Sequence, residues 1–209
     1  MRLTTALTLV FLASAALASG EPLRLSRASL AKNAEFVVTY TLTPKNGSKE
    51  TRAFRIEVSG DRARLDYSDS ALGPVRYLVN EKGIFFFIPA NKAAQKMEMK
   101  GGIDQALNLA FAQVLSEMKG AIRTGAANVS GQPTDVYKNP RTGTTIYIGK
   151  NPGFRLPVKM ETKNEGGAVS LVASSIRLNA TIVGTRFALP AGTQVIESRG
   201  GPAGLPGVK

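Results

Sequence analysis

The feature that most constrains the fold of this chain is a run of short strand-like segments between Arg52 and Met99. In most of them apolar residues alternate with polar or charged ones, which is the two-residue period of a strand with one buried face. Turn signals such as Gly60-Asp61 separate the segments, and no helical pattern lies between them. The strands expected here, with an earlier one that shares the period, are residues 36–42, 54–58, 62–67, 75–79, 84–88 and 96–99. The pattern therefore predicts an antiparallel β-meander with one apolar face that another element must cover.

The apolar period becomes helical directly after this meander. An apolar stripe of helical spacing is formed by Ile103, Leu107, Phe111, Val114, Leu115 and Met118. Glycines flank the segment on both sides, and Asp104 lies in the first turn, where the helix dipole favours a negative charge. We therefore expect one amphipathic helix that buries this stripe against the sheet.

A second set of strand signals follows the helix. These segments are residues 134–137, 144–148, 156–162, 169–176 and 187–190. Pro157 has no N–H to donate, so it indicates an edge strand or a bulge. The expected fold class is α+β, mostly β, with a curved antiparallel sheet covered by one or two helices in a single domain over residues 19–198.

Both ends of the chain have compositions of their own. Residues 1–18 combine a basic start, an apolar run and a small-x-small motif, which predicts a cleaved signal peptide rather than a membrane anchor of roughly 20 apolar residues. No cysteine follows that could carry a lipid. Residues 199–209 are rich in Gly and Pro, which is typical of a disordered tail. We expect a periplasmic or secreted protein.

Composition removes most catalytic chemistry. The chain has no Cys, His or Trp, so it lacks the commonest general base and every Cys/His nucleophile pair. The carboxylates Glu57, Asp66 and Asp69 alternate with apolar residues, and we expect them on the solvated side of the strands. The sequence therefore predicts no catalytic residues, no metal site and no cofactor, and an enzyme is the least favoured class.

The formal net charge is +12, which indicates an anionic partner or a solvated basic surface. For an exported protein, anionic lipid headgroups, cell-wall polymers or an acidic protein surface are better candidates than nucleic acid. Arg55, Arg62 and Arg64 alternate with apolar neighbours and share one sheet face. They are the candidate contacts for phosphate or carboxylate groups, and the alternative is an outer face that only keeps the protein in solution.

The apolar face of the sheet is the candidate ligand site. A single helix does not obviously fill a sheet of this many strands, and an incompletely filled concavity accepts an acyl chain. The alternative is an ordinary core between sheet and helix. The residues expected to line the cavity are Phe36, Tyr40, Phe54, Ile56, Leu65, Tyr67, Tyr77, Met97, Met99, Leu107, Phe111 and Met118.

The order of elements and two short segments resemble a known superfamily. The segments are Gly83 to Pro89, followed by Gln95-Lys96-Met97, and the terminal run Phe187 to Val195. They are similar to the periplasmic outer-membrane lipoprotein carriers of the LolA/LolB-like superfamily over most of the chain after residue 18. Those carriers usually have a Trp in the strand matching residues 85–87, so the resemblance is to a divergent member. It implies an unclosed half-barrel covered by helices, whose hydrophobic cavity takes lipid or lipoprotein acyl chains.

The leading hypothesis is therefore a noncatalytic periplasmic carrier or chaperone-like protein that holds acyl chains in an apolar half-barrel cavity. Its expected partners are a lipid or lipoprotein and an envelope membrane protein, with no nucleic acid, and the protein is expected to be a monomer. The alternative is an envelope interaction protein that uses the basic sheet face to bind an anionic polymer or a protein partner.

Overall fold

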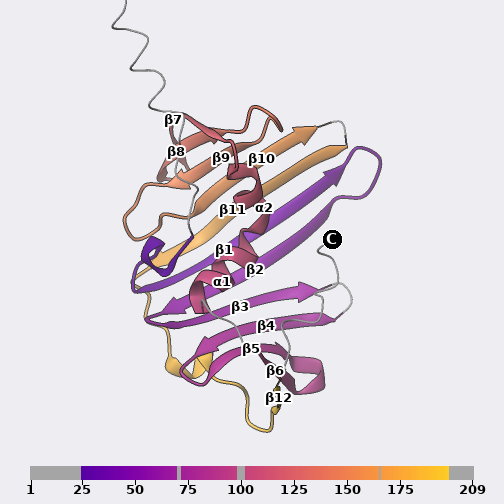
Figure 1. Cartoon of the computed structure of the whole chain (residues 1–209), viewed down its shortest axis with the longest axis vertical. Coiled ribbons are helices and arrows are strands. Elements are labelled where there is room, and N and C mark those ends of the chain that lie inside the picture. The colour runs from indigo at the N-terminus through magenta and orange to yellow at the C-terminus, as the bar shows by residue number, and fades with distance from the viewer. Residues whose placement is uncertain (1–24, 70–71, 98–101, 165, 198–209) are drawn as a thin grey trace, which may run out of the picture.

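The structure is a computed structural model that describes residues 25–69, 72–97, 102–164 and 166–197 (Figure 1). The predicted signal peptide, residues 1–18, and the predicted tail, residues 199–209, lie outside the described residues.

One sheet of twelve strands dominates the described part of the chain. The first meander consists of β1 (Asn33–Pro44), β2 (Glu50–Ser59), β3 (Arg62–Asp69), β4 (Gly73–Asn80), β5 (Gly83–Ile88) and β6 (Ala93–Met97). The second consists of β7 (Ile122–Val129), β8 (Gln132–Lys138), β9 (Thr145–Gly149), β10 (Pro157–Asn164) and β11 (Gly167–Leu178). The last strand is β12 (Gln194–Glu197), and short 3-10 helices lie at Arg27–Ser29, Pro89–Asn91 and Gly184–Phe187.

The strand order is β12-β6-β5-β4-β3-β2-β1-β11-β10-β9-β8-β7. Neighbouring strands are antiparallel, except that β12 runs parallel to β6. Strand β1 pairs with both β2 and β11, so the strand that opens the sheet in sequence lies in its middle and joins the two meanders. The two end strands, β7 and β12, do not pair with each other, so the sheet stays open. The predicted mostly-β fold with an unclosed antiparallel sheet is confirmed.

The predicted helix forms as two pieces, α1 (Gly102–Ala110) and α2 (Ala112–Met118). The break is at Phe111, whose φ of −120° and ψ of 19° leave the helical region. Figure 1 shows both helices lying across one face of the sheet, which we call the inner face. The predicted stripe is confirmed as the buried side: Ile103, Leu107 and Val114 are all buried, as is Phe111 itself. No helix within the described residues has the length and apolar character needed to span a membrane.

The main core lies between the inner face and the two helices. Phe36 on β1 stacks on Phe111 with ring centroids 6.5 Å apart, and it meets Phe154 edge to face at 5.1 Å. Each of these three side chains is fully buried. Burying a side chain of this size contributes roughly 1.5–3 kcal/mol, so the aromatic cluster is a principal source of stability.

A second, smaller core lies on the opposite face, which we call the outer face. Leu78, Phe85, Phe87 and Ala94 are buried there, and Leu189 packs against them. Leu189 belongs to residues 184–197, which cross the outer face from the 3-10 helix at Gly184–Phe187 to β12; we call this segment the C-terminal strap. The first meander is therefore covered on both faces.

The predicted irregularity at Pro157 is confirmed as a bulge. The register between β10 and β9 shifts between Pro157 and Lys159. Because Pro157 begins the strand, its missing N–H removes no interior ladder hydrogen bond.

Candidate functional site

An apolar cavity of about 130 Å³ lies between the inner face of the first meander and α1. Its lining consists of Phe54, Leu65, Tyr67, Tyr77, Phe86, Met97 and Leu109. All of these side chains are uncharged, and six of them come from the strands β2 to β6. The cavity therefore offers a ligand hydrocarbon and aromatic surface with no formal charge.

Sheet register brings the lining residues together. Phe54 lies opposite Tyr67, Leu65 lies opposite Tyr77, and Tyr77 lies opposite Phe86 on the next strand. Directly opposed residues on one face of an antiparallel pair have Cβ atoms about 5 Å apart, so their side chains form a continuous row. The rings of Phe54 and Tyr67 lie 5.4 Å apart. This row is the floor of the cavity.

The helix that covers the cavity is tied down by polar contacts near its ends. The backbone N–H of Arg27 donates to Asp104 Oδ1 at 2.7 Å, and the Tyr40 hydroxyl donates to the Ala110 carbonyl at 2.7 Å. Leu109 lies between these two ties and is 40% exposed. It is thus the part of the roof that solvent reaches.

The second helix is held by a polar cluster at its C-terminal end. The carboxylate of Glu117 accepts hydrogen bonds from the hydroxyls of Thr142 at 2.5 Å and Thr144 at 2.8 Å. Asn139 donates to the Glu117 carbonyl at 2.7 Å. Each of these partners lies in or beside the β8–β9 connection, so α2 is fixed to the second meander.

Burial raises the pKa values of the tyrosine hydroxyls near the cavity. It raises the pKa of Tyr77 to about 12 and raises the pKa of Tyr40 further. The pKa of Tyr67 is also raised, mainly by burial and then by the negative charge of Asp69. A tyrosine hydroxyl with its ordinary pKa of about 10 is already neutral near pH 7, so burial extends the neutral range of these three hydroxyls to more alkaline pH.

The predicted lining residues divide into several groups. The cavity brings together Phe54, Leu65, Tyr67, Tyr77 and Met97. The closed core holds Phe36, Ile56, Leu107 and Phe111. Tyr40 and Met118 are partly buried against that core, and Met99 lies outside the described residues. The helices therefore fill much of the inner face, and a small cavity remains at one end of it.

Sequence reasoning missed Phe86 and Leu109 as lining residues. Phe86 stands in a run of three phenylalanines, where period two gives no indication of which ring faces inward; its pairing with Tyr77 decides this. Leu109 lies two positions from Leu107, which places it off the buried stripe of α1. Only the position of the helix over the sheet could reveal that Leu109 borders a cavity.

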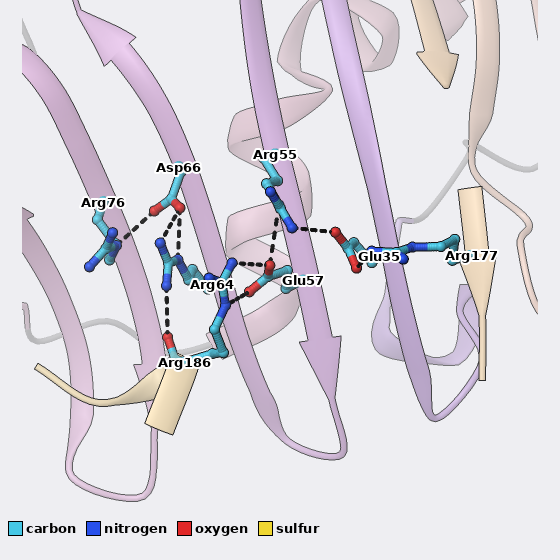
Figure 2. A network of polar contacts seen from close by, with 8 residues as sticks. All are labelled: Glu35, Arg55, Glu57, Arg64, Asp66, Arg76, Arg177 and Arg186. Carbon is cyan, nitrogen blue, oxygen red and sulfur yellow. Dashed lines mark hydrogen bonds and ion pairs between the residues drawn. The ribbon is translucent and has the colours of Figure 1, made fainter. Parts of the chain in front are cut away.

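The outer face of the same strands carries a row of ion pairs (Figure 2). Asp66 on β3 accepts from Arg76 Nε at 2.8 Å and pairs with Arg64 Nη2 at 2.5 Å. Arg55 on β2 reaches Glu35 Oε1 at 2.5 Å and Glu57 Oε1 at 3.2 Å. The remaining members of the row are Arg177, which pairs with Glu35, and Arg186, which pairs with Glu57.

Glu57 is the central residue of this row, and its expected solvation is wrong, because it is only 2% exposed. Arg186 of the strap covers it and binds both carboxylate oxygens, with Nε 3.0 Å from Oε2. The opposed residue on β1 is Glu35, and two like charges in this arrangement repel. Arg55 lies between them and pairs with both, which offsets the repulsion.

The ion pairs shift the pKa values of two members of the row, Asp66 and Arg186. Burial acts to raise the pKa of Asp66, but hydrogen bonds from Arg64 and Arg76 and their positive charges lower it overall. The hydrogen bond to Glu57 raises the pKa of Arg186. The charged forms of Asp66 and Arg186 are therefore both favoured by their partners in the row.

The three arginines predicted to contact anionic groups do share the outer face, but their surroundings differ. Arg55 and Arg64 pair with carboxylates of the same chain. No carboxylate among the described residues pairs with Arg62, whose guanidinium lies 5.2 Å from the ring centre of Phe187. Arg62 thus has the most available charge of the three.

The described residues contain no group of three His, Cys, Asp or Glu side chains placed to hold a metal ion. No family model matches the chain, and no curated protein matches it.

Solved structures do match. One is an uncharacterised conserved protein from Thermus thermophilus, with 10% identity and a TM-score of 0.51 over 81% of this chain and 93% of that one. At this identity the similarity shows the fold alone. The match indicates that the two proteins share this fold, and it assigns no activity.

Two other matches have lower TM-scores. A LolA superfamily protein from Nitrosomonas europaea has 6% identity and a TM-score of 0.38 over 79% of this chain and 93% of that one. MucB, in the MucA/MucB complex of Pseudomonas aeruginosa, has 19% identity and a TM-score of 0.45 over 83% of this chain and 61% of that one. Neither similarity assigns a function to this chain. The observed architecture, an unclosed antiparallel sheet with helices across one face, agrees with the fold that the sequence resemblance to the LolA/LolB-like superfamily implies.

Proposed function

We propose that this protein is a noncatalytic envelope carrier that binds an acyl chain of a lipid or lipoprotein between the inner sheet face and α1. The observation that carries the proposal is the uncharged cavity lined by side chains of five strands and by Leu109. An acyl chain gains free energy from leaving water and needs no polar partner, which matches this lining. Its acidic or polar headgroup stays outside.

The volume of the cavity sets a condition on binding. Ligand pockets usually measure about 300–1,000 Å³, whereas this cavity measures about 130 Å³. A bound chain therefore displaces the Leu109 side chain outward. The contacts at Asp104 and Ala110 hold α1 on either side of Leu109, so this partly exposed side chain is the part that moves.

The remaining parts of the proposal come from the sequence. The segment 1–18 favours export, so a periplasmic or secreted location is proposed together with the carrier role. The partners are the lipid or lipoprotein cargo and an envelope membrane protein that delivers or accepts it. We propose that the carrier acts as a monomer, because a carrier needs no second copy to enclose one chain.

The proposal is tested by acyl-chain binding to the purified full chain. Native mass spectrometry of protein isolated from its own envelope should find bound lipid, and a fluorescent long-chain fatty acid should bind the delipidated protein. Leu109→Asp places a charge at the cavity and should weaken fatty-acid binding about tenfold or more. Ile122→Asp is the control, because Ile122 is 50% exposed on β7 and does not line the cavity.

The measurement also separates the carrier from the alternative of a basic docking protein. Binding to the inner cavity should persist at high salt, whereas docking of the outer face on an anionic polymer should weaken. Lipid-free protein from the envelope, together with no fatty-acid binding in vitro, would exclude the carrier function. Equal losses in the two variants, with unchanged circular dichroism, would exclude this cavity as the site.

A further inference from the structure

The outer face holds a second and larger cleft of about 420 Å³, between β3–β6 and the C-terminal strap. Its apolar and aromatic lining comes from Phe85, Phe187, Ala188, Leu189, Pro190 and Val195. Its charged lining comes from Arg62, Lys82 and Lys96, with Glu81 and Glu197. It shares no lining residue with the inner cavity, and its volume lies in the usual range for ligand pockets, about 300–1,000 Å³.

The cations of this cleft are weakly neutralised, in contrast to those of the ion-pair row. Within the described part of the chain, neither Arg62 nor Lys82 pairs with a carboxylate. Lys96 reaches Glu197 only at 3.5 Å, and the Glu197 side chain is 78% exposed. Exposed ion pairs of this kind contribute little, so a ligand can displace this one at small cost.

Arg62 is held in place beside the strap. Its guanidinium lies 5.2 Å from the ring centre of Phe187, which leaves its N–H groups to point elsewhere. Gly184 approaches so closely that an added Cβ would lie 3.1 Å from Arg62 Nη1. Asn80 Nδ2 donates to the Phe187 carbonyl at 2.8 Å and ties the backbone of the strap to β4 at this point. A guanidinium placed in this way is ready to bind an oxyanion with parallel hydrogen bonds.

We propose that the outer cleft binds a small amphiphilic anion, a phosphate or carboxylate group carried on an apolar or aromatic body. The anionic group pairs with Arg62 and Lys82. The apolar body lies against Leu189, Pro190 and Val195 of the strap, because the rings of Phe85 and Phe187 are buried beneath the cleft. Because the strap forms one wall, the bound molecule also holds the strap to the sheet.

The test uses 1-naphthyl phosphate as the probe and the full chain in isothermal titration calorimetry. Inorganic phosphate and 1-naphthol are the two halves of the probe, and each should bind about tenfold or more weakly than the whole. Arg62→Gln and Lys82→Gln should each weaken binding of the probe by roughly tenfold. Arg52→Gln removes the same charge from an exposed arginine outside the cleft and should leave binding unchanged.

Lys82→Gln and Leu109→Asp keep the result interpretable. Arg62→Gln also removes the contact with Phe187, so a loss of probe affinity in that variant alone would mean that the strap had been disturbed. Lys82, in the β4–β5 turn, makes no such contact, so a loss of affinity in Lys82→Gln means that its charge binds the probe. Leu109→Asp should not change binding of the probe, because that residue lines only the inner cavity. The carrier function and the outer cleft can therefore fail separately.

Several results would overturn the proposal. An equal loss in Arg52→Gln would mean attraction to net charge alone, and a loss in Leu109→Asp would place the probe in the inner cavity. If inorganic phosphate or 1-naphthol bound as tightly as the whole probe, the cleft would not need both an anionic group and an apolar body in its ligand. Binding of phosphatidic acid vesicles without binding of free 1-naphthyl phosphate would make the cleft a membrane contact instead.

Discussion

The two faces of β1–β5 are built from alternate residues of the same strands, yet they are stabilised differently. The inner face is apolar throughout and packs on α1 and α2, with Phe36 and Phe111 fully buried. The outer face carries the ion-pair row of Figure 2 and a small apolar core under the strap. One face thus depends on burial of hydrocarbon, and the other depends on paired charges held by a distant segment.

Strand alternation therefore separates two faces without deciding which of them is solvated. Glu57 has the sequence pattern of a solvated residue but is buried, because residues 184–197 return to cover it. Each face also contains a hollow beside its covering element, apolar on the inside and cationic on the outside. The inner face, which is stabilised by apolar burial, is suited to an apolar ligand. The outer face, which is stabilised by paired charges, is suited to a charged ligand.

The largest expected effect comes from removing the inner aromatic core. Phe111→Ala leaves a void beside Phe36 at the junction of the two helices. Loss of a fully buried phenylalanine costs about 3–5 kcal/mol, so the free energy of unfolding in urea should fall by that amount. Leu109→Ala on the same helix is the control and should cost about 1 kcal/mol or less, because Leu109 is 40% exposed. Similar losses in both variants would mean that the helix pair packs loosely.

Sequence patterns were sufficient for most of the sheet and the helical stripe. Apart from residues 187–190, the period-two segments correspond to β1–β6 and β8–β11, and the stripe from Ile103 to Met118 corresponds to the buried side of α1 and α2. The strand expected at residues 187–190 is wrong, because Phe187 ends the 3-10 helix Gly184–Phe187 and the next three residues pair with no strand. Two strands escaped prediction for different reasons. Strand β7 is exposed on both faces and so shows no alternation, whereas β12 is short and is defined by its parallel pairing with β6.

The candidate sites were less predictable, because they depend on contacts between distant segments. Alternation identified the apolar lining around Tyr77, since residues on one face of neighbouring strands meet by register. The size of the cavity depends on how α1 lies over the sheet, and local pattern does not encode this. The outer cleft needs the strap to pass Arg62, which lies more than a hundred residues earlier in the chain.

An intermediate effect is expected from the ion pair between the outer face and the strap. Glu57→Gln leaves Arg186 without its carboxylate, and the Arg186 side chain is 38% exposed, so solvent screening reduces the cost. We expect a loss of about 1–2 kcal/mol. A double-mutant cycle with Arg186→Gln, followed by urea unfolding, measures the coupling between the two residues.

The matched pair for this cycle is Lys159–Glu161, which is also an ion pair on the sheet but is more exposed. Its coupling should be close to zero, because exposed pairs rarely contribute measurably. A coupling at Glu57–Arg186 no larger than at Lys159–Glu161 would mean that the strap is held by its apolar contacts alone, and the contrast between the two faces would disappear.

The smallest effect concerns the acid sensitivity of the outer face. The pKa of Asp66 is lowered from its usual 3.8 in the folded protein, so its ionised form favours folding. This contribution is fully present well above 3.8 and is lost as pH falls through the lowered pKa. Asp66→Asn should therefore be less stable than the parent near pH 6, and the difference should shrink as pH falls from 3.8 through the lowered pKa and the parent carboxyl takes up its proton. Urea unfolding across this pH range measures this, with Asp61→Asn in the exposed β2–β3 turn as control. A stability difference that does not change with pH would mean that Asp66 acts through packing rather than through its charge.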